Sequence, residues 1–156
     1  MRLTHVKAIV LSGLTWMFIG AFLLYKGLYY SVMCILAPPA MLNWIAHYLG
    51  SVQNGILFVI AVGLILGVVK ARYVLIKTIQ RVVKGIMVKP SPLKLTSVYS
   101  KRYCILILSM MLLGLTLRFL PITNDIRGLI DIAIGSALLN GALIYFRLAM
   151  MLKKER

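Results

Sequence analysis

The chain has 156 residues, of which 62% are hydrophobic and only 13% are charged. Soluble domains of this size carry about 25% charged residues, so the composition excludes an ordinary soluble protein and indicates one membrane domain over residues 1–156. The formal net charge is +15, from 18 Lys and Arg against 3 Asp and Glu. Such a charge also occurs in nucleic-acid binders. We expect no nucleic-acid partner, because a chain that faces the lipid bilayer uses its basic residues to fix its orientation.

The first apolar run covers residues 8–25 and follows a short basic segment. About 20 apolar residues are needed to cross the hydrocarbon core as a helix, so we expect a first span over about 8–26. A signal peptide has the same order of charge and apolar core, but this run is long and no small-residue cleavage site follows it. Gly13, Gly20 and Gly27 recur every seven residues and so share one helix face, which indicates helix packing.

Residues 27–53 are apolar, carry no Lys, Arg, Asp or Glu, and contain Pro38 and Pro39 near the middle. A double proline breaks a straight helix. The aromatic residues here are of the types that favour the bilayer interface: Tyr29, Tyr30, Trp44 and Tyr48. We therefore expect an interfacial or re-entrant segment on the outer side, with a fifth span as the alternative.

A second span over about 51–70 contains Gly63 and Gly67, a G-x-x-x-G pair that favours helix contact. Beyond Val69 the sequence becomes basic while its helical period continues. At about 100° per residue, four basic side chains share one face: Lys70, Lys77, Arg81 and Lys84. The opposite face is apolar: Leu75, Ile79, Val82, Val83 and Ile86. We expect one long helix that crosses the bilayer and continues as an amphipathic segment at its surface, with Gly85 near its end.

This basic face, defined as Lys70, Lys77, Arg81 and Lys84, has three interpretations. The charges can simply hold the helix end on the cytoplasmic side. They can bind anionic lipid headgroups, which are attracted by about 1 kcal/mol per basic residue near the surface. They can also dock an acidic partner protein.

The remaining apolar runs predict a third span over about 103–120 and a fourth over about 127–148. The fold class is therefore an all-α integral membrane protein with four transmembrane helices and a cytoplasmic basic segment over 70–102. With both termini cytoplasmic, fifteen of the 18 Lys and Arg lie inside, and only Lys26, Arg118 and Arg127 lie outside. We expect a multi-pass protein of the cell membrane, specifically a bacterial inner membrane.

Ionisable groups within the bilayer are costly and are candidates for function. Asp131 lies about one turn into the fourth span, and Arg118 and Lys26 lie at a similar depth. An ion pair between Asp131 and either cation would fix the helix register, or the group could form a substrate or ion site, or Asp131 could be solvated. Asn140 and Ser136 lie one turn apart on another face, where an interhelical hydrogen bond or a polar pathway lining is expected.

The sequence shows no paired carboxylates at membrane depth, no Ser/His/Asp set and no phosphate-binding glycine loop. We therefore expect no enzyme, no cofactor and no metal. The layout resembles that of small four-span bacterial inner-membrane proteins, without a motif that names a family. The leading hypothesis is a non-enzymatic membrane component that forms homo-oligomers or binds a membrane-protein partner. The alternatives are a small oligomeric transporter or channel with a polar site near Asp131, and an anionic-lipid-binding protein.

Overall fold

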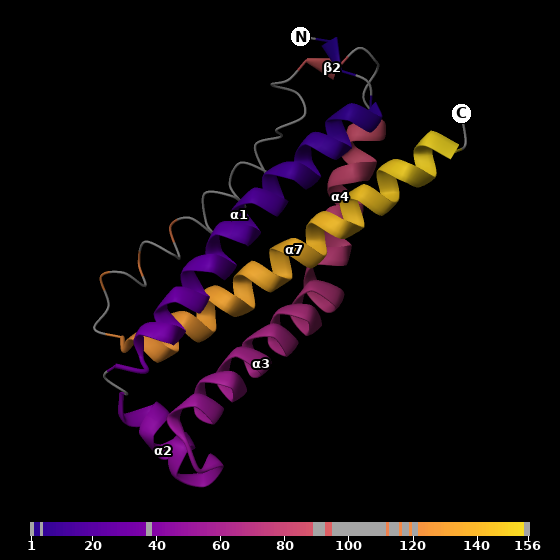
Figure 1. The fold of residues 1–156 in the computed structure, drawn as a ribbon. Coiled ribbons are helices and arrows are strands. Elements are labelled where there is room, and N and C mark those ends of the chain that lie inside the picture. Colours follow the sequence, from indigo (N-terminus) through magenta and orange to yellow (C-terminus); the bar gives the residue numbers. More distant parts are fainter. Residues whose placement is uncertain are drawn as a thin grey trace.

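The computed structural model describes residues 2–3, 5–36, 39–88, 93–94, 112, 116, 119 and 122–154, which are almost entirely helical (Figure 1). The long helices are α1 (His5–Met33), α3 (Val52–Lys70) and α7 (Asn124–Lys154). The shorter helical elements are α2 (Ala40–Leu49), the π-helical turn η1 (Ala71–Leu75) and α4 (Ile76–Met87). Two short strands, β1 (Arg2–Leu3) and β2 (Leu93–Lys94), pair antiparallel.

Within the described residues, three helices are long and apolar enough to cross a membrane: His5–Met33, Val52–Tyr73 and Asn124–Lys154. They correspond to the first, second and fourth predicted spans, and they are compatible with a multi-pass membrane protein. The first and last are longer than the predicted 8–26 and 127–148. The predicted third span, 103–120, lies outside the described residues apart from three isolated positions.

The segment over 27–53 differs from its prediction in one respect. Helix α1 continues past Lys26 to Met33, so Lys26 lies within the helix and not at its end. Helix α2 has 10 residues and covers only about 15 Å, which is too short to cross the hydrocarbon core. It begins after Pro39 and is capped at its C-terminus by Gly50, whose φ of 77° is the left-handed conformation that glycine adopts easily. The described residues of this segment therefore do not form a fifth span.

Helix α7 lies between α1 and α3, which contact each other little (Figure 1). Its contact surfaces are built from small residues, including Gly128, Gly135, Gly141 and Ala142, all of which are buried. Small residues let helix backbones approach closely in lipid. The chain is therefore assembled around its last helix.

The three glycines of α1 all face α7, and the two helices are antiparallel. A Cβ on Gly13 would lie 3.0 Å from Cβ of Tyr145, and one on Gly20 would lie 3.0 Å from the carbonyl oxygen of Gly135. A Cβ on Gly27 would lie 2.9 Å from the carbonyl oxygen of Gly128. The predicted packing face is thus present, and its partner belongs to the same chain.

The long helix predicted across the second span is continuous, because α3, η1 and α4 follow one another without a break. The helix passes Gly85 and ends at Met87, so Gly85 does not end it. The sequence pattern predicts this amphipathic segment at the bilayer surface, with its apolar side on lipid. In the structure the apolar side packs against the protein instead. Leu75, Ile79 and Val83 are buried in the core formed with α1 and α7. The amphipathic pattern was correct, but the bundle, not the bilayer, covers the apolar side.

Candidate functional site

A partly buried ion pair joins α1 to α7. Lys26 Nζ lies 3.5 Å from Asp131 Oδ2, and the side chains are 36% and 8% exposed, respectively. The same ammonium lies 5.6 Å from the centroid of the Tyr30 ring, within the range of a cation–π contact. The pairing that sequence position suggested is therefore present for Lys26, whereas Arg118 lies outside the described residues.

Close backbone contact between the two helices brings this pair together. A Cβ on Gly128 would lie 2.7 Å from Ser31 Oγ, so glycine is needed where α7 passes the last turns of α1. Ser31 Oγ donates a hydrogen bond to the carbonyl oxygen of Gly27 at 2.9 Å, which satisfies this buried hydroxyl within its own helix. The charges of Lys26 and Asp131 thus meet across a tightly packed crossing.

Asp125 is a second buried carboxylate that the sequence analysis did not single out. It is 2% exposed, and Oδ1 accepts a hydrogen bond from the backbone N–H of Ile126 at 2.8 Å. Oδ2 has no hydrogen-bond partner. The only signal in the sequence was an acid in the first turn of a helix, where the helix dipole favours negative charge.

A small cavity of about 10 Å³ lies beside Asp125, between the ends of α1, α2 and α3. This is about the space that one water molecule needs. Besides Asp125 it is lined by Ser31, Cys34, Leu42, Ile56 and Val59. The pKa of the Cys34 thiol is raised above its usual value, mainly by burial and to a smaller extent by the nearby Asp125 carboxylate. This end of the molecule is thus a packed, mostly apolar junction.

Ser136 and Asn140, the two polar residues on the fourth predicted span, make different kinds of hydrogen bond. Ser136 Oγ donates to the carbonyl oxygen of Leu64 at 3.3 Å, which is the predicted interhelical hydrogen bond. Asn140 Nδ2 instead donates to the carbonyl oxygen of Ser136 at 2.9 Å, within its own helix. The structure therefore does not bring Asn140 to Lys26 and Asp131.

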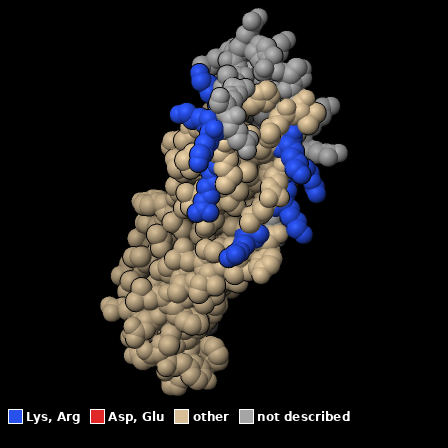
Figure 2. Space-filling view, turned by 90° about the vertical axis from the view of Figure 1, so that its right-hand side faces the viewer, with Lys and Arg blue, Asp and Glu red and all other residues tan. Residues whose placement is uncertain are grey.

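All four residues of the basic face are exposed. Other exposed Lys and Arg residues of the described chain lie at the same end of the bundle: Lys7, Arg72, Arg147, Lys153 and Lys154. Figure 2, which views the molecule from the right-hand side of Figure 1, shows Lys and Arg gathered over the upper part and neither basic nor acidic residues over the lower third. The charge is thus concentrated at the end where α1 begins and α7 ends.

The buried apolar side of α4 fixes the direction in which the basic face points. Ile79 and Val83 pack in one core with Ile9, Trp16 and Tyr145. The Trp16 and Tyr145 rings meet edge to face with centroids 5.6 Å apart. Because α4 is held on this side by α1 and α7, its basic side is presented as a fixed surface.

Within the described residues, no three His, Cys, Asp or Glu side chains are grouped so that they could hold a metal ion. No protein-family model matches the chain, and comparisons with curated proteins and with solved structures give no match. The ion pair and the basic face are therefore the two candidate functional features of the described chain.

Proposed function

We propose that this chain is a non-enzymatic, multi-pass membrane component that acts by binding a partner at its basic face. The observation that carries the proposal is the asymmetry of α4. Its apolar side is buried in the core, while Lys77, Arg81 and Lys84 are exposed. A helix that needed its charges only for topology would not require an apolar side fitted to the ends of two other helices.

The glycine faces that indicate helix packing do not support self-association of this chain. Gly13, Gly20 and Gly27 are filled by α7, and a Cβ on Gly63 or Gly67 would also meet α7 atoms. These contacts occur within one chain. The binding surface of the proposal is therefore the basic face and not a stripe of small residues.

Four spans with both ends cytoplasmic remain part of the proposal. Lys94 of β2 pairs with Arg2, next to the start of α1, whereas the first turns of α7 pack against the last turns of α1. The predicted third span, 103–120, and the end of the predicted basic segment, 70–102, lie between these two points in the sequence. A third span over 103–120 would return the chain from the end of the bundle where α1 begins to the end where α7 begins. The positive-inside rule then puts the basic end in the cytoplasm.

Site-specific crosslinking tests the proposed binding surface. A photo-crosslinking amino acid at Gln80, which is exposed on α4, should give an adduct in native membranes. The same group at Leu57, exposed near the start of α3, is the matched control. The adduct at Gln80 should weaken at high salt, since exposed charge attraction is screened. Equal, salt-independent adducts at the two positions would contradict the proposal.

A second candidate function is transport through the Lys26–Asp131 site. The buried Asp131 carboxylate favours it, because intramembrane acids often mark ion or proton pathways. The test is flux in reconstituted vesicles. Asp131→Asn should abolish flux if the carboxylate carries the ion, whereas unchanged flux would leave the pair with a purely structural role.

A further inference from the structure

We propose that the basic face binds an anionic phospholipid whose tails lie on α3 and whose phosphate contacts α4. This inference rests on the proposed function and names the chemistry of the partner. It draws on the exposed side chains of α3, η1 and α4 taken together.

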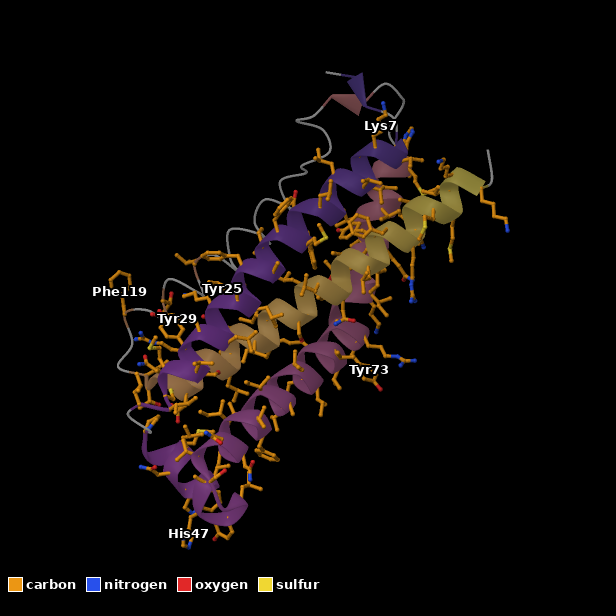
Figure 3. All side chains as sticks on the ribbon, in the orientation of Figure 1. Lys7, Tyr25, Tyr29, His47, Tyr73 and Phe119 are labelled. Carbon is orange, nitrogen blue, oxygen red and sulfur yellow. The ribbon has the colours of Figure 1, made fainter. Side chains whose placement is uncertain are left out.

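One exposed line of side chains runs along these elements, with members four and then three residues apart. It changes from apolar through aromatic to basic in the order Ile65, Val69, Tyr73, Lys77, Arg81 and Lys84. Ile65 is 61% exposed and Tyr73 is 72% exposed. Figure 3 shows Tyr73 projecting away from the bundle near the junction of α3 and α4. Tyrosine favours the boundary between hydrocarbon and headgroups, so the order along the line matches the order along a phospholipid from its tails to its phosphate.

The basic end of the line has no counter-charge within the described chain. The described acids, Asp125 and Asp131, lie in the first turns of α7, and Asp131 pairs with Lys26. Like charges three and four residues apart on a helix repel each other, as Lys77, Arg81 and Lys84 are placed to do. Anions from outside the chain would relieve this repulsion.

The apolar part of the line favours a lipid over an acidic protein. A soluble acidic segment would bind the ammonium and guanidinium groups but would make no favourable contact with the exposed Ile65 and Val69. An anionic phospholipid complements both parts through hydrocarbon contact and charge. Arg81 adds a planar guanidinium that can bind phosphate oxygens in pairs.

The experiment compares the full chain in nanodiscs of phosphatidylcholine alone and with added phosphatidylglycerol. Retained phosphatidylglycerol is counted by native mass spectrometry. The variant K77Q/R81Q/K84Q should bind phosphatidylglycerol about a hundredfold more weakly, given about fivefold per basic residue. R147Q/K153Q/K154Q removes the same charge at the same end but off the line, and it should retain binding. Equal losses in the two variants would overturn the proposed site.

Two further measurements separate the possible outcomes. The variant K77R/R81K/K84R changes the same three residues but keeps their charge, so it should keep binding. If it does, the loss in K77Q/R81Q/K84Q comes from the missing charge and not from misfolding. Tyr73→Ala should weaken phosphatidylglycerol binding but leave soluble polyglutamate binding unchanged. If polyglutamate binds the basic face and phosphatidylglycerol does not, the lipid inference is wrong while the proposed function stands. If neither binds and Gln80 gives no salt-sensitive adduct, both fail.

Discussion

Gly67 of α3 lies directly against Ser136 of α7, with no room for a side chain between the two helices. A Cβ on Gly67 would overlap Ser136 Oγ and lie 2.5 Å from the carbonyl oxygen of Ala133. The same serine donates its hydroxyl to the carbonyl oxygen of Leu64. Close approach and an interhelical hydrogen bond therefore occur at one crossing point, immediately before the π-helical turn.

Gly67→Ala should destabilise the protein, because α3 must move away from a backbone carbonyl that cannot yield. Overpacking of this kind costs about 1–3 kcal/mol. The measurement is thermal or SDS-induced unfolding in detergent. Gly85→Ala is the matched control, since a Cβ there meets nothing within 4 Å. In the control, alanine should leave stability unchanged or raise it by up to about 1 kcal/mol. Equal behaviour of the two variants would refute the tight crossing.

Asp131→Asn and Lys26→Gln should each lower stability, and their effects should not add. The Lys26 side chain is 36% exposed, so solvent screening limits the coupling to about 1 kcal/mol or less. A double-mutant cycle measured by unfolding gives this coupling directly. Strict additivity would show that the two groups do not stabilise each other.

Cys34 should react slowly with maleimide compared with an introduced cysteine at the exposed Leu36. Cys34 is buried, and its raised pKa leaves less thiolate at neutral pH, while thiolate is the reactive form. Its labelling curve should therefore lie at higher pH than that of Leu36→Cys. The comparison uses a Cys104→Ser background so that only one thiol reacts. Equal labelling rates would show that the junction between α1 and α2 is open.

Lys84→Cys and Tyr48→Cys test the orientation in intact cells. Both positions are exposed, and they lie at opposite ends of the described bundle. In a background without Cys34 and Cys104, an impermeant maleimide should label Tyr48→Cys and should label Lys84→Cys only after the cells are opened. The reverse pattern would invert the proposed topology.

The sequence predicted the helices well where apolar runs end in charged or capping residues. The second span began near Ser51, whose hydroxyl accepts from the N–H of Asn54, and changed character at Lys70, where α3 ends. It predicted the end of α1 poorly, because the residues after Lys26 remain apolar until the prolines and give no local stop signal. The π-helical turn likewise has no pattern of its own in these residues.

The sequence predicted part of the candidate site, namely the parts that follow from helix positions and spacing. Spacing and depth could pair Asp131 with Lys26, since both positions follow from helix lengths. Periodicity separated the basic and apolar sides of α4, but the same pattern suits a lipid surface or a protein core, so it could not show what covers Ile79. Asp125 sits in a polar stretch that reads as an exposed turn, and only the packing of α2 and α3 around it reveals its burial.

The pairing of α1 with α7 has a consequence for biosynthesis. The two helices are separated by about 90 residues of chain, which a ribosome adds in about 5–20 s. Throughout that interval the glycine-lined surface of the first helix has no permanent neighbour from its own polypeptide. Membrane insertion factors or neighbouring nascent chains would meet this surface first, so truncation before α7 should leave a product that quality-control proteases recognise.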